Sequence, residues 1–171
     1  MLPPYAELQC LSNFSFLRGA SRPEELVQRA KAVGYAALAI TDECTMAGIV
    51  RAHVQAKESG LKLLVGSQFR VNVGANDGFA VGQAFNLVML AKNLNGYGNL
   101  CEFITGLRRA TETKGTYQLT LDAIAGTALS DCLVIISPAR AITPAQLLEL
   151  GRWTLTHFAG RCWFGVEQLR M

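Results

Sequence analysis

Short apolar runs alternate along this chain with longer stretches in which apolar residues recur every three or four positions. The runs are typical of buried strands, and the longer stretches are typical of helices that pack on a sheet. Their order indicates β-α-β units, and therefore an α/β protein with about six mostly parallel strands and surrounding helices. The expected strands are 7–11, 36–41, 61–71 (broken at Gly66), 86–91, 132–136 and 162–166, and a loop is expected at 74–82.

Helix ends are marked by residues that satisfy free backbone groups. Ser21 with Glu24 three positions later predicts a capping box, Pro23 fits the first turn, and Gly34 ends that helix. Thr143 is expected to cap the last helix. The remaining helices are expected at 46–59, about 97–109, 119–124 and 144–158.

The apolar run from Leu38 in the expected strand 36–41 stops abruptly at two adjacent carboxylates, Asp42 and Glu43. In proteins built on parallel strands, side chains at the carboxyl ends of strands face the ligand crevice or the barrel mouth. The pair therefore favours metal chemistry. A structural alternative stays open, in which Asp42 caps the next helix and Glu43 stabilises its positive end.

Composition indicates a folded globular chain with a sizeable core. Its apolar runs all fall well short of the roughly 20 residues that a membrane span needs, and the first residues lack the form of a secretory signal. We therefore expect a cytoplasmic location and no membrane partner. Five scattered cysteines without a Cys-x-x-Cys pair indicate free thiols.

A formal charge of +3 is too small to indicate nucleic-acid binding by itself. The one basic cluster, Arg108, Arg109 and Lys114, is expected to be a solvated helix end. No basic residues interleave three phenylalanines that could stack on bases, so core or barrel-mouth positions are expected for them. These are Phe14, Phe16 and Phe69.

Nucleophilic catalysis is weakly supported. Cys44 follows the carboxylates near a helix start, but Glu43 would raise the pKa of the thiol, and a basic partner is missing. The two histidines, His53 and His157, fall inside expected helices rather than at strand ends. We expect an inert cysteine and no histidine ligand.

Four ordered segments together carry a family resemblance. They are YAELQCLSNFSFLRGAS at 5–21, AITDEC at 39–44, VGSQF at 65–69 and LAKNLNGY at 90–97. They resemble the PHP (polymerase-and-histidinol-phosphatase) domain that opens bacterial C-family DNA polymerases, with the closest similarity to the error-prone, damage-inducible branch. The resemblance covers essentially the whole chain.

The resemblance implies a distorted (β/α)7 barrel, whose strand ends in active members bind up to three metal ions and hydrolyse phosphoesters. Residues 1–171 would then be a single PHP domain, the N-terminal and C-terminally truncated part of a much longer polymerase. The barrel would be incomplete, because six strands are expected rather than seven. An open sheet edge near Val166 predicts self-association of the fragment.

The chain departs from the family's metal motifs. His-x-His is replaced by Gln9 and Leu11, and Thr-Asp-His ends in Glu43. Gln68 stands where a bridging glutamate is expected, and Asn86 where a further histidine is expected. The degenerate metal pocket therefore comprises Gln9, Leu11, Asp42, Glu43, Gln68 and Asn86, of which only the aspartate matches.

Leucine offers no donor and amides offer only a neutral oxygen, so we expect no catalytic residue and no bound cofactor beyond weak residual divalent metal. The resemblance then implies an inactive structural and interaction module of an error-prone polymerase that acts in damage-induced mutagenesis and translesion synthesis. Its partners would be the remaining polymerase domains, DNA through the Mg²⁺-dependent parent, and other translesion or replication proteins. The alternatives are a metal-dependent phosphoesterase or proofreading exonuclease, and a stand-alone adaptor.

Overall fold

The computed structural model describes residues 4–73, 84–125 and 129–166, so the expected loop at 74–82 lies outside the described residues. The strands are β1 (Ala6–Cys10), β2 (Ala37–Ile40), β3 (Lys62–Asn72), β4 (Ala84–Ala91), β5 (Cys132–Ser137) and β6 (Cys162–Phe164). The helices are α1 (Pro23–Ala32), α2 (Ile49–Ser59), α3 (Leu94–Arg109), α4 (Leu121–Ala125) and α5 (Pro144–Phe158). Each expected element is present.

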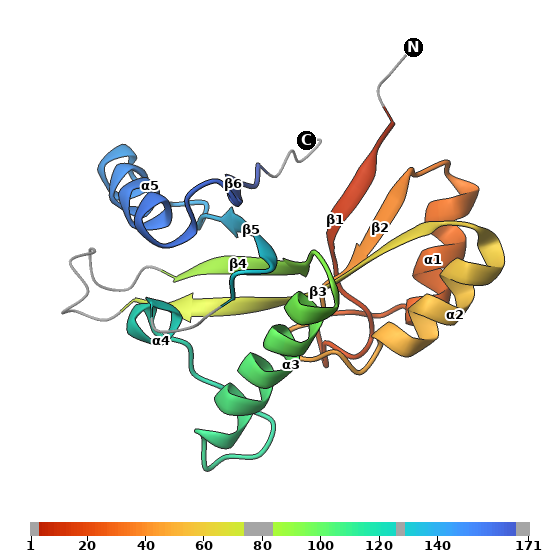
Figure 1. Cartoon of the computed structure of the whole chain (residues 1–171), viewed down its shortest axis with the longest axis horizontal. Helices are drawn as coiled ribbons and strands as arrows, with labels where there is room; N and C mark the ends of the chain where they lie inside the picture. Colours follow the sequence, from red (N-terminus) through yellow and green to blue (C-terminus); the bar gives the residue numbers. More distant parts are fainter. Residues whose placement is uncertain (1–3, 74–83, 126–128, 167–171) are drawn as a thin grey trace.

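The six strands form one sheet in chain order, β1 to β6. Three neighbouring pairs are parallel, whereas β4 runs antiparallel to both β3 and β5. Figure 1 shows the sheet curling into a half-barrel, with β1 and β6 on either side of its open part. The expectation of an incomplete α/β barrel is confirmed. Because β4 is reversed, its first residues lie beside the carboxyl ends of β3 and β5.

The outer face of the curled sheet is covered by helices. α1 and α2 pack together over β2, where Val27, Leu38 and Ala52 belong to one buried cluster. α3, α4 and α5 cover the other half, where Phe69 and Leu87 lie in a larger core. The inner face carries a small cluster around Ala39, Val88 and Leu90. The helices therefore pack on the outer face of the curled sheet, and the inner face lines a groove.

The first helix is capped one residue later than expected. The cap residue of α1 is Arg22, and Glu25 rather than Glu24 accepts a hydrogen bond from the Arg22 amide at 2.8 Å. Ser21 instead closes the preceding loop, because its carbonyl accepts from Asn13 N at 2.8 Å. The cap predicted at Thr143 for α5 is confirmed, and the structure adds a reciprocal bond with Gln146 that completes a capping box.

The second helix begins at Ile49, three residues later than expected. The chain after β2 is first tied to β3, because Cys44 N donates to Gln68 O at 2.9 Å and Thr45 N donates to Ser67 Oγ at 3.2 Å. Cys44 has a positive φ of 49°, which a helix does not allow. These cross-strand bonds delay the helix.

The sequence predicts a break in the third strand at Gly66, but β3 continues through this residue to Asn72. Gly66 pairs with Leu90 of β4, and a Cβ there would lie 2.5 Å from Met89 O. The glycine is therefore needed for close approach between strands rather than for a turn. The edge strand β6 ends at Phe164, two residues earlier than expected.

Candidate functional site

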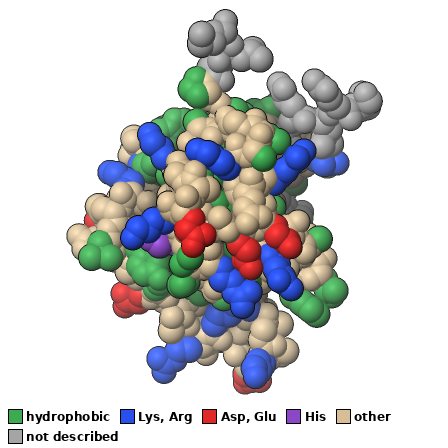
Figure 2. Space-filling model, turned by 90° about the vertical axis from the view of Figure 1, so that its right-hand side faces the viewer, with side chains coloured by type: hydrophobic (Ala, Val, Ile, Leu, Met, Phe, Trp, Pro, Cys, Tyr) green, Lys and Arg blue, Asp and Glu red, His purple; other side chains and the backbone are tan. Residues whose placement is uncertain are grey.

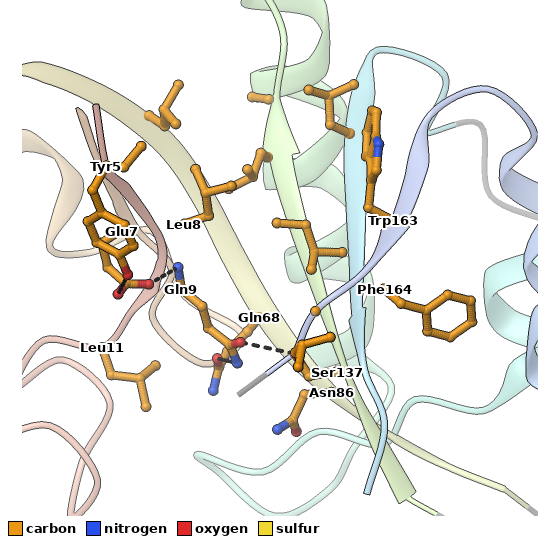
Figure 3. Close-up of a pocket in the computed structure, with 18 of the residues that line it drawn as sticks. Tyr5, Glu7, Leu8, Gln9, Leu11, Gln68, Asn86, Ser137, Trp163 and Phe164 are labelled. Atoms are coloured by element: carbon orange, nitrogen blue, oxygen red, sulfur yellow. Dashed lines mark hydrogen bonds between the residues drawn. The ribbon is translucent and has the colours of Figure 1, made fainter. Parts of the chain in front are cut away.

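An open groove of about 1220 Å³ runs along the inner face of the sheet, between the edge strands β1 and β6. Its walls are mainly apolar, with Tyr5 and Leu8 on one side and Trp163 and Phe164 on the other (Figure 3). Four of the six candidate positions line it, namely Gln9, Leu11, Gln68 and Asn86. Arg18, Lys92 and Glu7 are its charged lining residues.

Side-chain amides form a hydrogen-bonded chain across the groove. Gln9 Nε2 donates to Gln68 Oε1 at 3.0 Å, and Ser137 Oγ donates to Gln9 Oε1 at 3.1 Å. Figure 3 shows Gln9 placed between its two partners. The three residues come from β1, β3 and β5, which are not neighbours in the sheet. Neutral hydrogen bonds therefore join strands at Gln9 and Gln68, two of the positions where the resemblance implies metal ligands.

Asp42 is 1% exposed, and it turns toward the loop after β1 rather than lining the groove. Its Oδ1 accepts from Ser12 N and from Ser15 Oγ, both at 2.7 Å. Its Oδ2 accepts from Ser12 Oγ at 2.6 Å. The prediction that Asp42 caps the following helix is wrong, because its carboxylate binds a loop that precedes it by about thirty residues.

The carboxylate of Glu43 also bonds to protein groups, and the cap of α2 at Gly48 has no side-chain hydrogen bond. Glu43 Oε2 pairs with Arg18, and its Oε1 accepts from Tyr117 OH at 2.8 Å. Burial raises the pKa of Tyr117, and the neighbouring Glu43 raises it further, so the phenol remains a donor at neutral pH. Glu43 thereby links the loop after β1 to the segment before α4.

All four carboxylate oxygens of Asp42 and Glu43 thus accept hydrogen bonds from protein donors. Among the described residues, no group of three or more His, Cys, Asp or Glu is arranged to hold a metal ion. Binding a cation here would require breaking several charge-assisted bonds and using neutral amides as ligands. The donor set does not suit a metal ion.

Cys44 does not suit nucleophilic catalysis. The thiol is 1% exposed, and burial raises its pKa to about 11 even though Arg108 lies beside it. Arg108 is not a solvated helix end as expected, because it donates to the carbonyl of Cys44 at 3.1 Å and lies over the ring of Tyr117. The arginine therefore anchors α3 to the turn after β2.

The remaining candidates lie away from the groove. His53 is exposed on α2, and His157 lies beside Trp153 on α5 with their ring centroids 5.1 Å apart. Phe69 is buried as expected, whereas Phe16 is 84% exposed. Its expected place in the core or barrel mouth is wrong, because the loop after β1 turns it outward.

Several residues that build the site were missed from sequence, namely Ser12, Ser15, Arg18, Tyr117 and Ser137. Ser12 and Ser15 follow the end of β1, and Asp42 follows the end of the neighbouring strand β2. Hydroxyl residues and a carboxylate just beyond the ends of adjacent strands are the sequence signal that could have indicated these bonds. Tyr117 and Ser137 lie 74 and 128 positions from their partners, so nothing in the local pattern indicates them.

The model of the PHP domain family matches residues 7–140, most of the chain. The chain belongs to the PHP domain family. The PHP match runs from the second residue of β1 through β5 and includes α1 to α4, and thus all six candidate positions.

Curated relatives of this PHP domain are error-prone DNA polymerases. That of Bordetella parapertussis is 48% identical over 99% of this chain, and that of Dechloromonas aromatica is 51% identical over 97%. The matches cover only 16% and 15% of those relatives, so the chain spans about one sixth of their length.

Solved structures share the fold at low identity. An amidohydrolase from Chromobacterium violaceum, with bound sulfate and no metal, has a TM-score of 0.70 at 16% identity, over 92% of this chain and 75% of its own. A protein from Bifidobacterium adolescentis, classed as a metal-dependent phosphoesterase, has a TM-score of 0.62 at 14% identity, over 88% and 75%. At these identities the likeness concerns the fold alone.

Proposed function

We propose that this chain is the N-terminal PHP domain of an error-prone DNA polymerase, and that the domain is a catalytically inactive structural and interaction module. The observation that carries the proposal is the occupation of all four Asp42 and Glu43 carboxylate oxygens by protein donors. Identities of 48% and 51% to polymerases so named support the assignment to this branch.

The parent chain would add nucleotides opposite damaged template during translesion synthesis and damage-induced mutagenesis. Mg²⁺ bound in a separate polymerase domain would support that chemistry. A polymerase that copies the chromosome works in the cytoplasm, and the described helices include none long and apolar enough to cross a membrane. DNA would be contacted through the parent chain, alongside other translesion or replication proteins.

DNA contact through this domain itself has weaker support. Figure 2 views the molecule from the right-hand side of Figure 1, where α1 and α2 lie, and acidic and basic side chains are interspersed over that face. Affinity for nucleic acid rests on groups of Lys and Arg that neutralise phosphates. A mixed surface favours protein contacts instead.

A metal-dependent phosphoesterase or proofreading exonuclease is the second candidate. The fold likeness to the Bifidobacterium protein and the carboxylate of Asp42 favour it. The buried hydrogen bonds of Asp42 and the neutral Gln9–Gln68 pair count against it.

Metal analysis separates the two candidates. The purified chain is incubated with Zn²⁺ or Mn²⁺, desalted and measured by plasma emission spectroscopy, and then assayed on a chromogenic phosphodiester. We expect well under one ion per chain and no hydrolysis. The Bifidobacterium protein, treated alike, serves as the positive control. One tightly bound ion per chain, with turnover, would establish the second candidate.

The polymerase assignment is tested at the level of the gene. The reading frame is followed past Met171, and the encoded chain is assayed for primer extension across an abasic template site. We expect a chain about six times as long that extends the primer. A reading frame that stops at Met171 would instead indicate the stand-alone adaptor.

A further inference from the structure

The loop after β1, residues 13–21, carries two consecutive large apolar residues that are exposed to solvent. Phe16 is 84% exposed and Leu17 is 90% exposed. A single exposed leucine is ordinary on a protein surface. Two adjacent and almost fully exposed large side chains at one loop tip are the kind of apolar feature that marks a contact site. We call Phe16 and Leu17 the tip.

Hydrogen bonds within the loop and to Asp42 fix the backbone of the loop that carries the tip. Asn13 N donates to Ser21 O at 2.8 Å and closes the base of the loop. Ser15 Oγ donates to Asp42, and Arg18 N donates to Ser15 O at 2.9 Å. The backbone of the tip therefore has little freedom to lose when it binds, which favours affinity.

Backbone conformation at the tip is costly. Leu17 has a φ of 61°, in the left-handed region that residues with a side chain rarely adopt. Gly19, two residues after Leu17, packs closely against the start of the loop, because a Cβ at this position would clash with Ser12 O at 1.9 Å. Strain retained in an exposed and hydrogen-bonded loop points to a task for the side chain it presents.

The chemistry of the tip selects a protein pocket rather than DNA. Arg18 is the one basic residue of the loop, and its charge is paired with Glu43. Leu17 lacks an aromatic face, so only Phe16 could stack on a base. An apolar pocket would bury both side chains together.

We propose that the Phe16–Leu17 tip docks into an apolar pocket on the remainder of the polymerase chain that carries this PHP domain, an inference that rests on the proposed function. The matched relatives have about five sixths of their length beyond this region. A pocket in the same chain meets the tip at high effective concentration, so a contact of only two residues is sufficient.

Site-specific photo-cross-linking in the full polymerase tests the docking. Benzoylphenylalanine replaces Phe16, and in a matched control it replaces Val50, which is 71% exposed on α2. After irradiation and digestion, we expect position 16 to link to peptides beyond residue 171 of the same chain, and position 50 to give no such links.

Leu17→Gly supplies the second readout. Glycine relieves the positive φ, so we expect the thermal midpoint of the PHP domain to rise. The same change removes one docking side chain, so cross-linking from position 16 should fall by about tenfold, the factor expected for a hot-spot residue. A purely structural tip would not show these opposite effects.

The outcomes separate docking from the proposed function. Cross-links only to added primed DNA, only to a second copy, or to nothing would overturn the docking while leaving a working polymerase. A reading frame that ends at Met171 would overturn both, because no remainder would exist to hold the pocket.

Discussion

Ser12 and Asp42 are joined by two hydrogen bonds, from Ser12 N to Oδ1 at 2.7 Å and from Ser12 Oγ to Oδ2 at 2.6 Å. Both residues are fully buried, so neither bond competes with water. A carboxylate at a strand end, a position suited to a metal ligand, serves here to hold a loop. The same aspartate accepts from Ser15, and the loop it holds presents the exposed tip.

Asp42→Ala should lower the free energy of unfolding by about 3 kcal/mol, because three donors lose a charged acceptor and Ser12 is left buried without its partner. Urea denaturation followed by circular dichroism measures this. Asp122→Ala is the matched control, since Asp122 is exposed on α4 and should change stability by less than about 0.5 kcal/mol. Equal effects for the two variants would contradict the role of Asp42.

Gln9 and Ser137 should be energetically coupled across the groove. Each single alanine variant removes the 3.1 Å bond between them, so the second substitution costs less once the first is present. A double-mutant cycle by urea denaturation should give a coupling of about 0.5 to 1 kcal/mol. Strict additivity would mean that the bond does not hold β5 to β1.

Two glycines in α3 should respond to alanine in opposite directions. A Cβ at Gly96 would lie 2.1 Å from Asp131 O, whereas a Cβ at Gly98 would meet nothing within 4 Å. Gly96→Ala should therefore cost about 1 to 3 kcal/mol by overpacking, and Gly98→Ala should stabilise by up to about 1 kcal/mol through helix propensity. Thermal unfolding of the two variants checks both signs.

Stability should fall at alkaline pH. Burial raises the pKa of the thiols of Cys10, Cys44 and Cys162 to about 11. The unfolded chain releases these protons at lower pH than the folded chain, so stability is complete below about pH 8.5 and is lost as pH rises toward 11. Urea midpoints across this range measure the slope. Cys44→Ala should flatten it, and Cys101→Ala, which keeps all three thiols, should not.

The isolated chain should associate through β6. Trp163 is 54% exposed and Phe164 is 42% exposed on β6, which is an edge strand of the sheet that the described residues form. Light scattering at several concentrations should show dimers or larger species, and Trp163→Glu should reduce them. Val54→Glu, on the exposed side of α2, is the control. A monomer at tens of micromolar would show that this edge is protected within the chain.

Element order was predictable because its signals are local. Apolar runs mark β2 and β5, and Thr143 lies three residues from the Gln146 that completes its cap. The starts of α1 and α2 were predicted too early, because they depend on contacts between residues that are farther apart in the sequence. Ser21 is used to close a loop, and Cys44 is held by β3. Gly66 was misread because its neighbour across the sheet, Met89, is 23 positions away.

The sequence alone determined the six strands, the family resemblance and the loss of the imidazole donors, because each depends on residue type and spacing along the chain. The partners of Asp42, Glu43 and Gln9 were decided only by the tertiary structure. A carboxylate or amide can bond to any donor that the fold brings within reach, and these donors lie 25 to 128 positions away. The exposure of Phe16 and Leu17 was decided in the same way, because Asp42, just beyond the end of the neighbouring strand β2, fixes the loop that turns them outward.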